Sequence, residues 1–145
     1  MTPPPSDSPT PFSDPAATPP SDPPIPSSDP ASPKPLGPYT PIVQAGDWLI
    51  CSGQIGQKDG VLADGITAQV AQAIENISAL LAGAGSSLER VVKTTVFLAD
   101  IGDYPAMNDA YVRAFPSHRP ARSAFAVAAL PMGASVEIEA WAYQK

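Results

Sequence analysis

Hydrophobic positions beyond about residue 40 recur with two different periods, and each period predicts a different kind of element. A period near four predicts a helix from about Thr67 to Ala82, because its apolar side chains then share one helix face. That stripe consists of Val70, Ile74, Ile77 and Leu81. A second helix is predicted from about Tyr104 to Phe115, with Asp103 placed to cap its first turn.

Runs with a period of two, or short continuous apolar runs, predict five strands. Two of them lie between Ile42 and Ser52, separated by a Gly46-Asp47 turn, and the second is expected to end at Gly53. The other three are expected at Val91–Leu98, near Arg122–Ala128 and near Ser135–Tyr143.

Turn and cap residues separate these elements. Residues 56–65 are polar and rich in turn formers, and they are interpreted as a loop. Residues 86–89, Ser-Ser-Leu-Glu, have the spacing of a capping box and predict one short helical turn. The resulting order, β-β-α-β-α-β-β, predicts a two-layer α+β sandwich with both helices on one face of the sheet.

The last predicted strand has an unusual second face. Its first face is aliphatic and is expected to pack under the helices. The opposite face carries Glu137, Glu139, Trp141 and Tyr143. Aromatic rings beside paired carboxylates favour an interface with another subunit, with polar pockets along the contact. The alternative is a solvated face with scattered aromatic residues, which is normal in soluble proteins.

Composition divides the chain of 145 residues into two parts. Fifteen of its 20 prolines lie before residue 39, and residues 1–35 contain no long apolar run. That segment cannot bury enough apolar surface to offset its ordering entropy, so residues 1–35 are predicted to be a disordered tail and residues 36–145 a single domain. Three Ser-Asp-Pro repeats in the tail are typical of a linker, and a docking or phosphorylation segment is the alternative.

Charge, cysteine and histidine content argue against several classes of function. The net charge is −6 and no basic stripe is present, which argues against nucleic-acid binding. Cys51 is the only cysteine and His118 the only histidine, so no metal site is expected. The N-terminus has no signal-like segment and no stretch is long enough to span a membrane, so a cytoplasmic location is expected.

Six short segments together carry a resemblance to a known family. They are Gly37-Pro38-Tyr39, Ser52-Gly53-Gln54, residues 92–98, Met107-Asn108, residues 120–123 and residues 136–140. In this order and spacing the chain resembles the RidA/YjgF/UK114 family. The resemblance implies a chorismate-mutase-like fold and a homotrimer with three clefts between subunits. It also implies hydrolysis of small 2-imino acids, such as 2-iminopropanoate and 2-iminobutanoate, to 2-oxo acids and ammonia without a cofactor.

The same resemblance assigns roles to individual residues. Arg122 matches the arginine that grips the substrate carboxylate, and a guanidinium fork suits that task. Glu137 matches the glutamate that activates the attacking water. The family's cleft-lining positions correspond to Tyr39, Ser52, Gly53 and Asn108. Ala124 stands where the family has a well-known cysteine, so only a backbone role in substrate binding is expected there.

Three other functions remain open at this point. The chain could act on a different enamine or imine, which the pocket lining would decide. It could be a non-catalytic module that binds small carboxylates, in which case Arg122 would matter and Glu137 would not. Ribonuclease activity is the least favoured, because acid–base cleavage of RNA usually draws on histidine and the acidic domain would repel phosphates.

Overall fold

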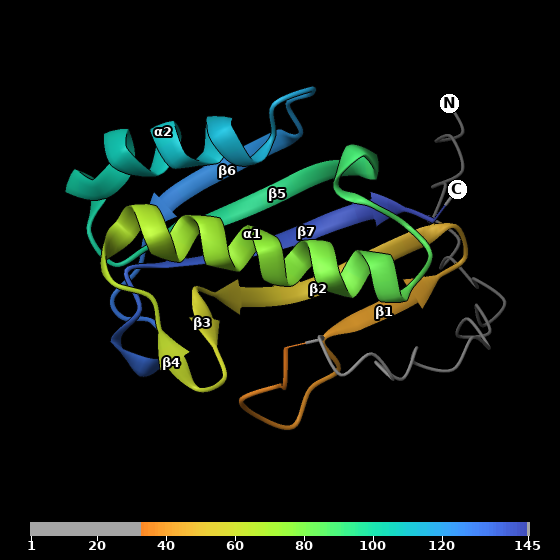
Figure 1. The fold of residues 1–145 in the computed structure, drawn as a ribbon, viewed down its shortest axis with the longest axis horizontal. Helices are drawn as coiled ribbons and strands as arrows, with labels where there is room; N and C mark the ends of the chain where they lie inside the picture. Colours follow the sequence, from red (N-terminus) through yellow and green to blue (C-terminus); the bar gives the residue numbers. More distant parts are fainter. Residues whose placement is uncertain (1–32, 145) are drawn as a thin grey trace, which may run out of the picture.

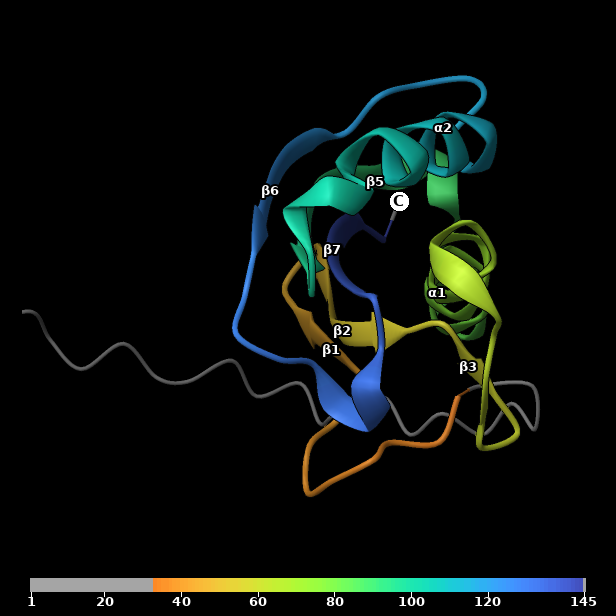
Figure 2. The ribbon, with the colours of Figure 1, turned by 90° about the vertical axis from the view of Figure 1, so that its left-hand side faces the viewer.

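The computed structural model describes residues 33–144, which form one sheet covered on one face by two helices (Figure 1). The sheet has the order β1-β2-β7-β5-β6. Its strands are β1 (Ile42–Ala45), β2 (Trp48–Ile55), β5 (Val91–Leu98), β6 (Ala121–Ala126) and β7 (Val136–Tyr143). The helices are α1 (Gly65–Gly83) and α2 (Tyr104–Ala114). Figure 2 shows both helices on the same side of the sheet, so the predicted two-layer α+β class is confirmed.

The core lies between the helices and the sheet. All four residues of the predicted α1 stripe are buried, as are the four inward-facing residues of β7. Complete burial of one aliphatic side chain stabilises a fold by about 1.5–3 kcal/mol, so these two stripes hold the layers together. The prediction for residues 1–35 lies outside the described residues except for 33–35.

One element was missed at the sequence level. Residues 56–65 are not a plain loop, because β3 (Gln57–Lys58) and β4 (Val61–Leu62) pair as a small antiparallel ribbon. Asp59 and Gly60 form its turn with φ of 52° and 80°, the left-handed pair that suits an Asp-Gly hairpin. The amide of Asn76 on α1 donates to the carbonyl oxygens of Ile55 and Gln57, and it thereby ties the ribbon to the helix.

The two predicted helix starts exist, but neither has a side-chain capping hydrogen bond. A short 3-10 turn (Ile101–Asp103) precedes α2, and it is the Asp100 carboxylate that accepts a hydrogen bond, from the Gly102 amide at 2.8 Å. Asp103 therefore has helical backbone angles and its side chain caps nothing. The expected turn near residue 88 exists at Leu88–Arg90 without a side-chain cap. The Ser86 hydroxyl instead donates to the carbonyl oxygen of Tyr143 at 2.6 Å.

Strand β2 continues two residues beyond its predicted end at Gly53. Its pairing with β7 shifts between Cys51, which faces Ala140, and Gln54, which faces Ile138. Ser52 and Gly53 therefore oppose a single residue of β7, which is the arrangement of a β-bulge. Bulges bend a strand and re-aim its side chains, so the two residues at the bulge leave the regular alternation.

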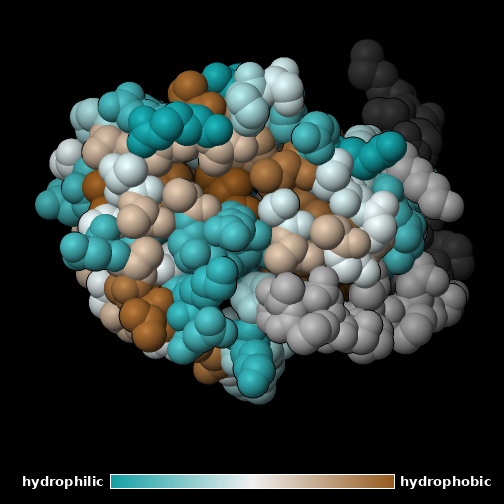
Figure 3. All heavy atoms as spheres, in the orientation of Figure 1, coloured by the Kyte–Doolittle hydropathy of each residue, from teal (hydrophilic) through white to brown (hydrophobic). Residues whose placement is uncertain are grey.

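The helix-bearing face is shown in Figure 3, where hydrophobic side chains gather in a band between α1 and α2. The other face of the sheet carries no helix (Figure 2). Strand β6 pairs with β5 only, in parallel, and so forms one edge of the sheet. No helix within residues 33–144 has the length and apolar character needed to cross a membrane.

Candidate active site

The seven predicted site residues fall into two separate groups. The first, called here the Arg122 group, consists of Asn108, Arg122 and Ala124 on α2 and β6. The second, called the Glu137 pocket, contains Tyr39, Ser52, Gly53 and Glu137, which line one cavity. None of the Arg122 group lines that cavity.

Strand register explains the separation. Arg122 pairs with Thr94, which is fully buried beneath the helices, so Arg122 also faces the helices. Glu137 pairs with Phe97, which lies on the opposite face of β5. Within one chain, the two residues expected to act together therefore project from opposite faces of the sheet.

The guanidinium of Arg122 is held by side chains of α2. Its Nη2 donates to Asn108 Oδ1 at 2.7 Å and to the Tyr104 hydroxyl at 3.2 Å, while Nη1 lies 3.7 Å from the Met107 sulfur. The guanidinium carbon is also 4.7 Å from the centre of the Tyr111 ring, which is a cation–π distance. These contacts orient the charged group while its partners stay uncharged.

The side chain of Tyr111 is itself held in place by a hydrogen bond. Its hydroxyl forms a 2.7 Å hydrogen bond with the hydroxyl of Thr94, and both residues are buried. Burial raises the pKa of Tyr111, against smaller opposing effects of Thr94 and Arg122. The phenol therefore stays neutral at physiological pH and presents its ring face to Arg122 without competing for its charge.

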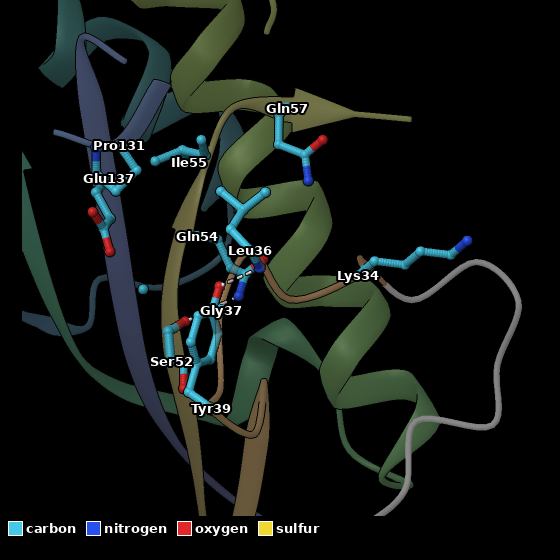
Figure 4. Close-up of a pocket in the computed structure, with 11 residues that line it drawn as sticks. Lys34, Leu36, Gly37, Tyr39, Ser52, Gln54, Ile55, Gln57, Pro131 and Glu137 are labelled. Atoms are coloured by element: carbon cyan, nitrogen blue, oxygen red, sulfur yellow. Dashed lines mark hydrogen bonds between the residues drawn. The ribbon is translucent and has the colours of Figure 1, made fainter. Parts of the chain in front are cut away.

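The Glu137 pocket is a cavity of about 330 Å³ between the segment preceding β1 and strands β2 and β7. Figure 4 shows the side chains of Tyr39, Ser52 and Glu137 around it, each from a different one of these elements. A volume near 300 Å³ is at the lower end for small-ligand sites, which suits a metabolite of a few carbon atoms.

Gly53 creates the space in which Glu137 lies. A Cβ atom at Gly53 would stand 2.0 Å from Oε1 of Glu137 and 2.8 Å from its carboxyl carbon. The β-bulge brings the backbone of Gly53 to this position, so the carboxylate and the glycine fit only as a pair. Glycine at this position thus lets the backbone of β2 approach the Glu137 side chain closely.

The Glu137 carboxyl has an altered proton affinity. Burial raises its pKa above the ordinary value, and the negative charge of Glu139 on the same face raises it further. A carboxylate with a raised pKa is a stronger base than one in water, which favours a role in moving protons.

The other two polar groups of the pocket are partly engaged. Ser52 Oγ donates to the carbonyl oxygen of Thr40 at 2.7 Å, so its lone pairs remain free to accept. The Tyr39 hydroxyl accepts from the Leu36 amide at 3.1 Å, and its own hydrogen remains free to donate. Tyr39 is 43% exposed and stands at the mouth of the cavity.

Of the residues that contact the Arg122 guanidinium, only Asn108 was predicted to have a functional role. Tyr104, Met107 and Tyr111 follow one another at helical spacings of three and four on α2, next to Asn108. That spacing is visible in the sequence, but it is equally typical of a helix face that packs into the core. Cys51 is buried, and burial raises its pKa to about 12.

Residues 33–144 contain no group of three or more His, Cys, Asp or Glu side chains arranged to hold a metal ion.

Comparison of the sequence with known proteins identifies the family of this chain. A family model described as Endoribonuclease L-PSP matches residues 30–144. The human 2-iminobutanoate/2-iminopropanoate deaminase is 41% identical over 109 residues, which cover 73% of this chain and 80% of that protein. The chain belongs to this family, which is the RidA/YjgF/UK114 family that its sequence resembles. A RutC family protein of Pyrococcus horikoshii is 44% identical over 110 residues, covering 74% of this chain and 87% of that protein.

Solved structures of the RidA/YjgF family share the fold. RidA from an Antarctic Psychrobacter is 40% identical with a TM-score of 0.75, and the match covers 78% of this chain and 94% of that one. The YjgF protein of Escherichia coli is 37% identical with a TM-score of 0.75, covering 79% and 94%. Escherichia coli TdcF, solved with bound serine, is 33% identical with a TM-score of 0.75 and the same coverage.

Proposed function

We propose that this protein hydrolyses small 2-imino acids, of the 2-iminopropanoate and 2-iminobutanoate type, to 2-oxo acids and ammonia. The observation that carries the proposal is the oriented guanidinium of Arg122, since a planar cation fixed by neutral partners suits a small carboxylate. Relatives about 40% identical are named as deaminases of these imines, and TdcF was solved with serine, which is itself a small amino acid.

The active site in this proposal is shared between subunits of a homotrimer. Arg122 and Glu137 lie on opposite faces of one sheet, so one chain cannot offer both to the same small molecule. A neighbouring copy can bring its Glu137 pocket to the open edge at β6, next to Arg122. The helix-free face also exposes Phe125 and Trp141, at 47% and 43%, which favours its burial against another copy.

The chemistry then follows from the two groups. Arg122 of one subunit holds the substrate carboxylate, and Glu137 of the next accepts a proton from water as the water oxygen bonds to the imine carbon. The π electrons of the C=N bond move to nitrogen, which takes that proton from Glu137 and becomes an amino group beside the new hydroxyl. Glu137 then accepts the hydroxyl proton and passes it to the amino nitrogen, so that the C–N bond breaks, ammonia leaves and the C=O bond of the oxo acid forms.

Ala124 fits this scheme through its backbone alone, since an alanine side chain carries no reactive group. The scheme needs no thiol and no cofactor. Tyr39 and Ser52 bound the cavity in which the imine carbon would lie, and each keeps one hydrogen-bonding function free.

Ribonuclease activity, which the description of the family model names, has less support in this chain. The single histidine, His118, lies outside both groups of site residues, with Nε2 3.2 Å from the carbonyl oxygen of Val91. The net charge of −6 also works against binding a polyanion. The cytoplasmic location stays a prediction, and the relatives include a mitochondrial fission-yeast protein.

The proposal is tested by imine trapping. A threonine dehydratase generates 2-iminobutanoate in place, and semicarbazide competes with the protein for it. We expect the protein to reduce semicarbazone formation while the yield of 2-oxobutanoate is kept. No acceleration over spontaneous hydrolysis would overturn the deaminase assignment. Glu137→Gln separates catalysis from mere binding, because a non-catalytic carboxylate-binding module would keep its ligand affinity and its biological effect in that variant.

A further inference from the structure

Tyr104 was absent from the predicted site, yet it touches the central cation of the Arg122 group. Its hydroxyl oxygen accepts a hydrogen bond from Nη2 of Arg122 at 3.2 Å. Its ring centre lies 5.7 Å from the guanidinium carbon, and the side chain is 37% exposed. The phenol therefore lies between Arg122 and solvent, on the side from which a ligand can approach.

The donors of Arg122 can be accounted for one by one. A guanidinium binds a carboxylate through two parallel N–H bonds, and both of its donor pairs include Nη2. The two N–H groups of Nη2 are already used, by Asn108 Oδ1 at 2.7 Å and by the Tyr104 hydroxyl at 3.2 Å. A carboxylate can form the two-bond contact only where one of these acceptors leaves.

The two acceptors differ in how firmly they are held. The bond to Asn108 is short and partly buried, whereas the bond to Tyr104 is longer and exposed. A longer, solvated hydrogen bond is the weaker of the two, and water can replace it at little cost. Tyr104 is therefore the acceptor that a carboxylate displaces.

We propose that the Tyr104 hydroxyl occupies the carboxylate-binding arm of Arg122 in the free protein and is displaced when the substrate binds. Tyr104 thus acts as a positioning residue that keeps the guanidinium aligned and lowers affinity for substrate and product alike. The inference rests on the proposed function, because it assumes that Arg122 receives the carboxylate of a 2-imino or 2-oxo acid.

The test is Tyr104→Phe, which keeps the aromatic ring beside the guanidinium and removes only the competing oxygen. One exposed hydrogen bond typically contributes about 0.5–1.5 kcal/mol, so we expect KM for 2-iminobutanoate and Kd for 2-oxobutanoate to fall about 2- to 10-fold. The value of kcat should change less than twofold, because the reacting atoms lie at Glu137. Val112→Ala is the control, since it shortens an exposed side chain elsewhere on α2, and neither constant should move.

A rise in Kd or KM in Tyr104→Phe would overturn the inference, since the hydroxyl would then assist carboxylate binding. Unchanged constants would also overturn it. Calorimetry with 2-oxobutanoate keeps this outcome distinct from failure of the proposed function. If wild type binds the oxo acid without accelerating imine hydrolysis, the deaminase assignment fails while the Tyr104 inference is still decided by the two Kd values. Absence of binding to wild type would refute both.

Discussion

The Arg122 group and the Glu137 pocket are built on opposite principles. Around Arg122, neutral side chains of α2 contact the guanidinium from several sides and fix its direction. Around Glu137, a glycine and a β-bulge leave space, and burial beside Glu139 makes the ionised carboxylate less stable. In the proposed function, binding would be served by many contacts to one charge, and proton transfer by a carboxylate whose ionised form is disfavoured by burial. Because the two groups depend on different contacts, a substitution can change either the Arg122 group or the Glu137 pocket and leave the other intact.

The largest expected effect on activity comes from Arg122→Ala, which removes the charge of the Arg122 group. Two charge-assisted hydrogen bonds of about 1.5–3 kcal/mol each would be lost, so kcat/KM in the trapping assay should fall at least 100-fold. The Glu137 pocket should remain, since Arg122 does not line it. Arg113→Ala, on the exposed side of the last turn of α2, removes the same charge and should keep wild-type activity. Equal losses in both variants would point to a general charge effect.

Gly53→Ala changes the Glu137 pocket without removing a charged group. The new Cβ would stand 2.0 Å from Oε1 of Glu137, so the carboxylate must rotate away. A displaced catalytic group typically costs about 100-fold, and we expect kcat to fall by roughly that factor while Kd for 2-oxobutanoate changes little. A loss confined to Kd would show that Gly53 serves binding instead. Circular dichroism before and after heating would verify that the variant is folded.

Mixed assembly of two variant chains tests whether Arg122 of one subunit and Glu137 of another form one site. Arg122→Ala and Glu137→Gln chains, co-expressed in equal amounts with different tags, should assemble at random, so that about one quarter of all interfaces in the population pair an intact arginine with an intact glutamate, which is one interface in three within each mixed trimer. Activity should therefore recover to about a quarter of wild type, although each variant alone is inactive. No recovery in isolated mixed trimers would place both residues in a site within one chain.

The smallest expected effect concerns stability. The raised pKa of Glu137 means that the folded state binds its proton more tightly than the unfolded state does. The free energy of unfolding therefore decreases as pH rises from the ordinary value of 4.5 through the raised pKa, and it stays lower above that. Glu137→Gln cannot ionise, so it should melt at a higher temperature than wild type at pH 7. The two melting curves should converge below pH 4.5, and a less stable variant at pH 7 would contradict this account.

Much of the fold was predictable because its signals are local. Periodicity located both helices and all five strands of the sheet, and the odd outer face of β7 was visible from alternation alone. Asp103 was predicted at the start of α2 but forms no capping hydrogen bond, because a 3-10 turn that leaves no periodic trace precedes the helix and is capped by Asp100. The β3–β4 ribbon was missed because strands of two residues show no alternation. Its Asp59-Gly60 dipeptide, which is typical of a hairpin turn, was the available signal.

The sequence named the candidate site residues but could not give their arrangement. Motifs named Arg122 and Glu137, but their placement on opposite faces depends on the pairing of β6 with β5 and of β7 with β5. A shift of one residue in either register would reverse the result, and no local pattern fixes a register between strands far apart in the chain. The contacts of Tyr104 and Tyr111 with Arg122 were hidden for the same reason.

The bulge at Ser52 and Gly53 also limits how this stretch of chain can change in length. Deleting one of the two residues would leave a single residue opposite Glu139 and make the ladder between β2 and β7 regular. Leu49 and Cys51 would keep their places in the core, because Cys51 already faces Ala140 and Gln54 already faces Ile138. The close approach of the Gly53 backbone to Glu137 would be lost, so a one-residue gap here should spare the fold and damage the Glu137 pocket.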